Sequence, residues 1–216
     1  MQRVTDVFLA GLAIVVLTPL LLPLAIMLRF TGEGEVLYRQ SRIGIDGQIF
    51  KIYKFATMLK NSSNIGSGTL TMKNDPRVLP IGVFLRKTKI NELPQLLNIL
   101  FGDMSIVGPR PLLPDGEELY SPTDQKVIRS VRPGVTGIGS LMLRDEESYY
   151  AHRSDAHEFY MRVISPYKAE LEVWYIKRKS FWLDIKLIIL TFVAIITPTI
   201  DLDGYFNGLP EKPSEL

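Results

Sequence analysis

The sequence lacks several features on which common protein functions depend. It has no cysteine, which excludes disulfide bonds, thiolate metal sites and a cysteine nucleophile. Its two histidines, His152 and His157, are five positions apart and do not share a helix face, so no metal-binding pair is predicted. The net charge of +2 predicts no nucleic acid as a partner. A Walker loop, a Gly-x-Ser-x-Gly elbow and a dinucleotide fingerprint are also absent.

Charge is missing entirely from one long segment, Val7 to Leu28, which has 22 residues. A straight helix of that length rises about 33 Å, enough to cross the hydrocarbon core of a bilayer. A signal peptide is disfavoured, because only one arginine precedes the run and no small-x-small cleavage site follows it. Basic residues after the run place the rest of the chain on the cytoplasmic side. They are Arg29, Arg39, Arg42, Lys51 and Lys54.

Two prolines, Pro19 and Pro23, interrupt the middle of this run. Each removes a backbone donor and presses its ring against the preceding turn, so a sharp kink is expected. The hydroxyl of Thr18 is a candidate partner for a carbonyl freed by the kink. Two geometries follow, a kinked span or a helix that dips into the membrane and returns to the same face.

The remaining elements are predicted from periodicity and turn residues. Two strands at 35–40 and 48–55 flank the turn residues 44–47, which predicts a hairpin. A flexible loop is expected at 61–69, and helices at 80–89, 92–101 and 153–177. The apolar stretch 187–197 is too short to span a bilayer. Neighbouring Trp174, Tyr175, Phe181, Trp182 and Lys186 favour an interfacial helix, with a buried core helix as the alternative.

The segment around Asn91 and Glu92 is the first candidate site. Asn91 is predicted to cap the helix that follows, with Glu92 in its first turn and Arg86, Lys87 and Lys89 just upstream. Free backbone N–H groups and cations near an acid suit a phosphate or a metal phosphate. The alternative is a capped helix with a solvated basic turn.

Arg110 is the second candidate, because prolines flank it on both sides. Such a stiff backbone holds a guanidinium at low entropic cost, and arginine matches phosphate oxygens with two parallel hydrogen bonds. Arg132, followed by Pro133 and Gly134, repeats the pattern more weakly.

Several motifs together resemble the bacterial sugar transferase family, the monotopic polyprenyl-phosphate phosphoglycosyl transferases of glycan assembly. The resemblance covers about residues 1–195. It rests on Phe50–Met58, Asn91–Asn98, Gly102–Pro111 and Val131–Gly137, together with the Thr-Pro-broken anchor. It implies a mainly helical α+β fold with a re-entrant membrane helix at 1–30, a small β-hairpin, a compact helical catalytic domain with interfacial amphipathic helices at 31–200, and a tail at 201–216. The implied location is the cytoplasmic face of the bacterial inner membrane.

The resemblance also implies a reaction and its participants. In that family an Asp of an Asp-Glu pair attacks the β-phosphorus of a UDP-sugar, UMP leaves, and polyprenol phosphate attacks the acyl phosphate. Mg²⁺ and arginines neutralise the phosphates. Carried onto this chain, the catalytic pair is Asn91 and Glu92, with Glu92 also the metal ligand. The phosphate-binding residues are Arg110, Arg86, Lys54 and Arg132.

Two positions depart from the family pattern. Asn91 stands where the family has its nucleophilic Asp, and a carboxamide cannot form the acyl phosphate. Ala56 replaces the usual Lys or Arg. Four explanations stay open: Glu92 is the nucleophile, the lipid phosphate attacks directly, another acid substitutes, or the protein is inactive or altered. Asp145, Glu146 and Glu147 are the candidates for another acid, unless they form a solvated helix start.

Two other functions compete with phosphosugar transfer. One is a silent membrane scaffold on the same fold, which Asn91 and Ala56 favour. The other is a glycosyltransferase that moves the sugar without its phosphate, suggested by the Asp-x-Asp pattern of Asp201 and Asp203. Release of UMP indicates phosphosugar transfer, and release of UDP indicates glycosyl transfer.

Overall fold

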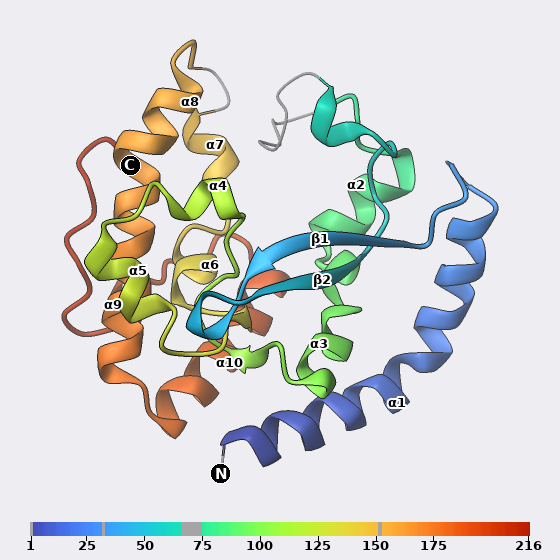
Figure 1. Cartoon of the computed structure of the whole chain (residues 1–216), viewed down its shortest axis with the longest axis horizontal. Helices are drawn as coiled ribbons and strands as arrows, with labels where there is room; N and C mark the ends of the chain where they lie inside the picture. The colour runs from blue at the N-terminus through green and yellow to red at the C-terminus, as the bar shows by residue number, and fades with distance from the viewer. Residues whose placement is uncertain (1, 32, 66–74, 151–152) are drawn as a thin grey trace. The chain divides into compact units, whose positions relative to one another are not determined.

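The computed structural model of this protein describes residues 2–31, 33–65, 75–150 and 153–216 (Figure 1). The chain is mainly helical and forms two compact units. The first unit contains Met1–Gln40 and Lys51–Gly102, and the second contains Ser41–Phe50 and Asp103–Leu216. Residues 66–69 of the predicted flexible loop and His152 lie outside the described residues.

The α-helices and strands in chain order are α1 (Gln2–Arg29), β1 (Leu37–Ile43), β2 (Ile49–Phe55), α2 (Pro80–Lys87), α3 (Gln95–Phe101), β3 (Ser105–Val107), α4 (Pro114–Glu117), α5 (Pro122–Ile128), β4 (Gly134–Thr136), α6 (Ile138–Met142), α7 (Glu146–Tyr150), α8 (Ala156–Phe159), α9 (Ser165–Arg178) and α10 (Phe181–Ile196). Short 3-10 turns lie at Ile45–Gly47, Ser62–Asn64, Ile90–Glu92 and Asp203–Tyr205, and a π-helical turn lies at Tyr160–Ile164.

Strands β1 and β2 form the predicted hairpin. Its turn contains two consecutive residues with positive φ, Asp46 at 55° and Gly47 at 76°. This backbone matches the right-handed twist of the two strands, and Asp-Gly is a favoured pair for it. The structure also contains a second strand pair that the sequence did not predict. In it β3 and β4 run parallel, with Ser105 opposite Gly134 and Val107 opposite Thr136.

Helix α1 contains the whole apolar run and both prolines. Figure 1 shows it changing direction beyond its midpoint, in agreement with the predicted kink. The hydroxyl of Thr18 donates to the Ile14 carbonyl at 2.7 Å. The carbonyl that lacks a donor because of Pro19 is that of Val15, so Thr18 does not satisfy it as the sequence suggested. A hydrogen bond from a threonine hydroxyl to the carbonyl four residues earlier often bends a helix, in addition to the effect of the prolines.

One side of α1 is packed and the other is exposed. Leu28 is buried with Phe55 and Leu85 in the core of the first unit, and Ala10 is fully buried nearer the N-terminus. Arg3 donates to the carbonyls of Ile99 and Leu100 and so caps the end of α3. The exposed side carries large apolar residues, which include Val4, Phe8, Leu12, Val15, Leu20 and Ile26. The helix is long and apolar enough to cross a membrane, and these exposed residues suggest membrane association.

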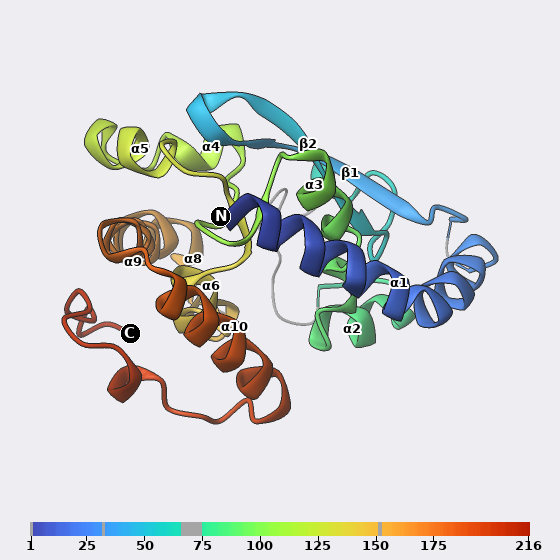
Figure 2. The same ribbon diagram turned by 90° about the horizontal axis from the view of Figure 1, so that it is seen from below.

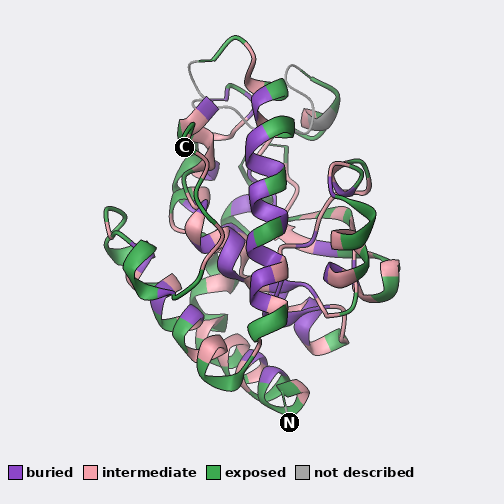
Figure 3. Ribbon diagram, turned by 90° about the vertical axis from the view of Figure 1, so that its left-hand side faces the viewer, coloured by how far each residue is buried: buried purple, intermediate pink, exposed green. Residues whose placement is uncertain are grey.

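The second unit is built around α9, whose buried face Figure 3 shows in purple. Tyr175, Leu171, Phe159 and Ile164 are fully buried there. The helix predicted at 153–177 is confirmed in outline, since α8, the π-helical turn and α9 follow one another from Ala156.

The apolar stretch predicted at 187–197 belongs to the longer helix α10 (Figure 2). Ser180 caps its start by accepting the Leu183 N–H. Leu187, Leu190 and Ala194 are buried on one side. The exposed apolar side chains are Phe181, Trp182, Ile189, Phe192, Ile195 and Ile196. A purely buried core helix is therefore excluded, and an interfacial helix stays the prediction.

Candidate functional site

In the first unit the central feature is an ion pair between Lys54 and Glu92. Lys54 lies near the end of β2, and its Nζ is 2.8 Å from Oε1 of Glu92 in the turn that precedes α3. The two side chains are only 15% and 12% exposed. Because water is largely excluded, this pair is screened far less than a surface ion pair. The structure thus brings together two of the residues that the sequence selected separately.

Asn91 does not cap a helix, which corrects the sequence prediction. Lys89 adopts a left-handed conformation with φ of 59°, and residues Ile90–Glu92 form a 3-10 turn. Pro94 occupies the capping position of α3 instead. The first N–H groups of the segment are taken by carbonyls of the preceding turns, such as Glu92 to Lys89 and Leu96 to Leu93. Helix α3 therefore does not offer the open row of N–H donors expected for an anion.

The Asn91 side chain is buried, and its Oδ1 has no hydrogen-bond partner. Leaving such an oxygen unpaired costs about 1–3 kcal/mol. Ala56, the other departure from the family pattern, is also buried and donates its N–H to the Val36 carbonyl. Among the other predicted cations, Arg86 lies in the last turn of α2 and contacts the Met58 sulfur at 3.7 Å.

A buried ion pair that the sequence analysis did not select lies in the same unit. Arg77 donates to both carboxylate oxygens of Asp75, and both residues are buried. The Arg77 guanidinium also donates to the carbonyls of Ser62 and Ile65. Arg77 thus fixes the chain that follows Met58, at the end of one of the recognised motifs. Only a spacing of two between the charges marks this pair in the sequence.

In the second unit three glycines, Gly108, Gly134 and Gly137, allow the backbones of the loops that carry Arg110 and Arg132 to approach closely. A Cβ at Gly134 would lie 2.1 Å from the Gly108 nitrogen, and one at Gly137 would lie 2.2 Å from the Gly108 oxygen. The Gly134 N–H donates to the Pro109 carbonyl at 2.8 Å. The loops that carry Arg110 and Arg132 therefore pack backbone to backbone, which only glycine permits. Both arginines were candidates from the sequence, but this contact was not predicted.

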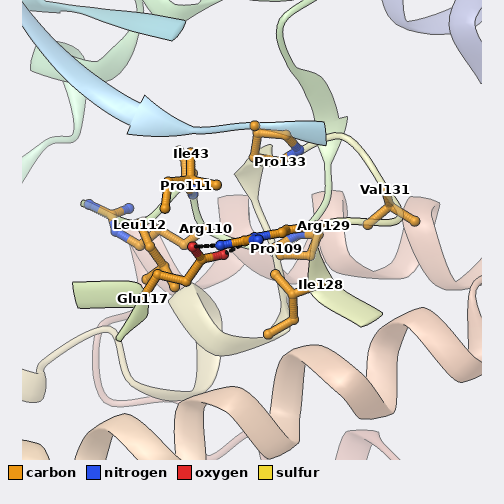
Figure 4. A pocket seen from close by; sticks show the side chains of 11 residues that line it. Ile43, Pro109, Arg110, Pro111, Leu112, Glu117, Ile128, Arg129, Val131 and Pro133 are labelled. Carbon is orange, nitrogen blue, oxygen red and sulfur yellow. Dashed lines mark hydrogen bonds and ion pairs between the residues drawn. The ribbon is translucent and has the colours of Figure 1, made fainter. Parts of the chain in front are cut away.

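The hairpin tip, which belongs to the second unit, buttresses the Arg110 loop. Ile43 N–H donates to the Leu112 carbonyl at 3.0 Å, and the Arg42 guanidinium donates to the Pro111 carbonyl at 3.0 Å. A small pocket opens beside these contacts (Figure 4). Across it the Arg129 guanidinium binds the buried Glu117 carboxylate through two parallel hydrogen bonds. The lining residues are Ile43, Gly44, Pro109–Leu112, Glu117, Ile128, Arg129, Val131 and Pro133.

Beneath Arg110 lies a buried carboxyl that the sequence analysis missed. The Arg110 N–H donates to Oε1 of Glu172 on α9 at 3.2 Å, and Glu172 is only 2% exposed. Burial raises the pKa of Glu172 to about 7, against the opposing effects of the Arg110 N–H, Lys168 and the Arg110 charge. The only sign of Glu172 in the sequence is a charged residue among the positions that α9 buries. That sign can be recognised only once the buried face of α9 is known.

Asp145 and Glu146, two of the candidates for another acid, lie in different surroundings. Glu146 starts α7 and pairs with the buried Lys168 at 2.5 Å, whereas Asp145 is exposed. The carboxylate of Glu146 thus has a structural partner. Asp201 accepts the Asp203 N–H at 3.0 Å in an exposed turn, so this Asp-x-Asp pattern forms a local turn.

Within the described residues, no three His, Cys, Asp or Glu side chains form a group that could hold a metal ion. Glu92 offers a carboxylate, and the adjacent residue Asn91 has an unpaired side-chain oxygen, Oδ1. Mg²⁺ usually takes one or two carboxylates and completes its shell with substrate phosphates and water. The donor set therefore fits Mg²⁺ when phosphates supply the remaining ligands.

Comparison with known proteins gives a consistent result. The sequence model described as bacterial sugar transferase matches residues 1–198. The chain is 36% identical over 194 residues to the UDP-glucose:undecaprenyl-phosphate glucose-1-phosphate transferase of Klebsiella pneumoniae, covering 88% of this chain and 39% of that protein. It is 40% identical over 162 residues to the exopolysaccharide production protein ExoY of Sinorhizobium fredii, covering 68% of this chain and 71% of that protein. It is 30% identical over 210 residues to the undecaprenyl-phosphate galactose phosphotransferase of Salmonella typhimurium, covering 91% of this chain and 40% of that protein. The chain thus spans about two fifths of the first and third of these relatives.

Proposed function

Since this chain belongs to the bacterial sugar transferase family, we propose that it transfers a sugar phosphate from a UDP-sugar to polyprenol phosphate and releases UMP. The observation that carries the proposal is the family match, which extends over residues 1–198 and so contains Lys54, Glu92, Arg110 and Arg132. Relatives named for glucose, galactose and N-acetylgalactosamine phosphate transfer support the reaction class without selecting a sugar.

Glu92 is the acid that we propose to be essential. Asn91 cannot form an acyl phosphate, whereas the adjacent Glu92 is a carboxylate that forms an ion pair with Lys54. In a two-step reaction, a Glu92 oxygen bonds to the β-phosphorus. The bond from that phosphorus to the oxygen that it shares with the α-phosphorus breaks. UMP leaves with the electron pair. A polyprenol phosphate oxygen then bonds to the same phosphorus, and the carboxylate leaves.

The direct alternative needs no covalent enzyme. In it the polyprenol phosphate attacks the β-phosphorus itself, and Glu92 serves as a charged ligand for the metal phosphate. Mg²⁺, when bound, neutralises the phosphate charge in either route. Arg110 and Arg132 add fixed positive charge on a rigid backbone, which phosphoryl transfer requires.

The test is to mix the purified protein with polyprenol phosphate, Mg²⁺ and a panel of UDP-sugars, and to assay the nucleotide released. UMP is the expected product. UDP would replace the proposal by glycosyl transfer, and no nucleotide from any donor would favour the silent scaffold.

Arg110→Lys should reduce turnover at least about tenfold, or roughly 1.4 kcal/mol of barrier. Lysine keeps the charge but cannot offer two parallel hydrogen bonds to one phosphate. UMP release under saturating lipid measures the effect. Arg162→Lys, at an exposed arginine of the second unit, is the matched control and should stay near wild type. Normal turnover in Arg110→Lys would remove Arg110 from the phosphate site.

We further propose that α1 enters the inner membrane from the cytoplasmic face and returns to it. The kink between Thr18 and Pro23 and the exposed apolar residues of α1 support this path. Because the chain has no cysteine, Gln2→Cys gives a single label site. A membrane-impermeant maleimide should label it from the cytoplasmic side alone, like Glu118→Cys on the exposed surface of the second unit. Labelling of position 2 from the periplasm would contradict the re-entrant path.

A further inference from the structure

Glu172 forms a hydrogen bond with the backbone of Arg110, a residue of the proposed phosphate site. Its Oε1 accepts the N–H of Arg110 at 3.2 Å, between the two prolines that stiffen this loop. The carboxyl is buried on α9, and its second oxygen has no hydrogen-bond partner. A buried, half-satisfied carboxylate is expensive, so a packing role alone would be met better by an apolar residue.

The surroundings hold the carboxyl in one place. A Cβ at Gly139 of α6 would lie 2.5 Å from Oε1 of Glu172, so this glycine leaves the space that the carboxyl fills. Gly137 approaches the other oxygen, where a Cβ would lie at 3.8 Å. Helices α6 and α9 therefore clamp Glu172 against the Arg110 loop, and its carboxyl has little room to move elsewhere.

Several charged and titratable groups face this carboxyl. Lys168 lies one turn earlier on α9 and pairs with Glu146 of α7. Tyr160 lies against the Lys168 ammonium, whose Nζ is 5.8 Å from the ring centroid. Glu172 helps to raise the pKa of the buried Tyr120, after desolvation as the larger cause. The Arg110 charge faces Glu172 from the loop.

We propose that Glu172 is a positioning residue, whose ionised carboxylate accepts the Arg110 N–H and holds this arginine in register for the substrate phosphates. The expected effect on turnover rests on the proposed function. The expected ordering of the Arg110 backbone by Glu172 does not. Glutamine at this position could accept the same N–H without the charge. Glu172→Gln therefore mimics the protonated form and separates charge from shape.

The effects of pH on stability and on turnover have opposite signs. The folded-state pKa of Glu172 is raised from 4.5 to about 7, so between these values the folded protein holds a proton that the unfolded chain has lost. Its contribution to stability is full below pH 4.5 and is lost as the pH rises through 7. Turnover instead gains from the ionised form, because a carboxylate accepts a stronger hydrogen bond than a carboxylic acid.

The first experiment measures amide exchange at Arg110 and needs no turnover. After correction for intrinsic rates, Glu172→Ala should exchange this amide at least tenfold faster than wild type, while Glu172→Gln changes it little. Glu170→Ala, at an exposed glutamate on the same helix, is the matched control. Unchanged exchange at Arg110 in Glu172→Ala would overturn the positioning role, even if the protein proved to be inactive on every UDP-sugar.

The second experiment measures the ratio of wild-type turnover to Glu172→Gln turnover between pH 5.5 and 8.5. The ratio cancels ionisation of the substrates. We expect it to rise severalfold through pH 7, while the melting temperature of wild type falls relative to Glu172→Gln. A ratio that stays constant, or that falls with the melting temperature, would show a merely structural residue and would sink the role of the charge. Absence of UMP from wild type would instead refute the proposed function and leave the exchange result standing.

Discussion

Glu92→Gln should abolish UMP release, with a loss of at least about 1,000-fold, or about 4 kcal/mol of barrier. The substitution keeps the shape of the side chain but removes the carboxylate that pairs with Lys54. A carboxamide is not a nucleophile, and as a neutral group it binds Mg²⁺ more weakly than a carboxylate, so both catalytic roles of Glu92 are impaired together. Turnover equal to that of wild type would defeat every role of this residue in catalysis.

The two roles of Glu92 are separated by intact-protein mass spectrometry with UDP-sugar and no lipid. A phosphosugar adduct on wild type that is absent from Glu92→Gln identifies Glu92 as the nucleophile. If transfer is direct, wild type shows no adduct and releases no UMP until polyprenol phosphate is added. Residual activity of Glu92→Gln that recovers at high Mg²⁺ would identify a metal-binding role.

Asn91→Asp and Glu118→Gln are the partner experiments. Asn91→Asp restores the family carboxylate at a buried position, but Ala56 still stands where the family has a cation. We expect modest activity, improved by adding Ala56→Lys. Glu118→Gln removes the same charge from an exposed surface position of the second unit and should leave turnover unchanged.

Arg77→Leu should destabilise the protein by about 3–5 kcal/mol, because it removes the positive charge that pairs with the buried Asp75 carboxylate. The Arg77 and Asp75 side chains are only 4% and 2% exposed. The variant also deprives the carbonyls of Ser62 and Ile65 of their donor. Urea unfolding of the purified protein in detergent measures the loss.

The chain supplies a control with the same spacing of charges. Arg153 and Asp155 also lie two positions apart and form an ion pair, but their side chains are 38% and 42% exposed. Arg153→Leu should destabilise the protein much less than Arg77→Leu, because water screens the exposed pair. Equal losses in the two variants would show that the burial of Asp75 does not set the cost. Asp75→Leu combined with Arg77→Leu should recover part of the loss, because it also removes the buried negative charge.

Local chemistry made several features predictable. A run of 22 residues without charge can hardly be accommodated except against lipid or in a core, and its prolines must disturb the helix. The hairpin followed from strand periodicity around an Asp-Gly turn, whose backbone is set by those two residues. Arg110 was selected because its flanking prolines restrict the backbone before any tertiary contact forms.

The error at Asn91 has an identifiable physical cause. Asparagine is a good cap in isolation, but Lys89 turns left-handed and starts a 3-10 turn one residue before it. Pro94 then becomes the residue that precedes α3. Capping preference is worth about 1 kcal/mol, and packing of this turn outweighs it.

The sequence by itself determined the apolar helix with its kink, the hairpin and the proline-stiffened loop of Arg110, because each depends on neighbouring residues. It also placed Asn91 directly before Glu92. Only the tertiary structure decided which distant groups meet. It joined Lys54 to Glu92 across 38 positions and placed Glu172 beneath Arg110 across 62. It also pressed the loops of Arg110 and Arg132 together at three glycines. Contacts of this kind arise from burial and close packing of separate segments, and no local pattern in either segment specifies its partner.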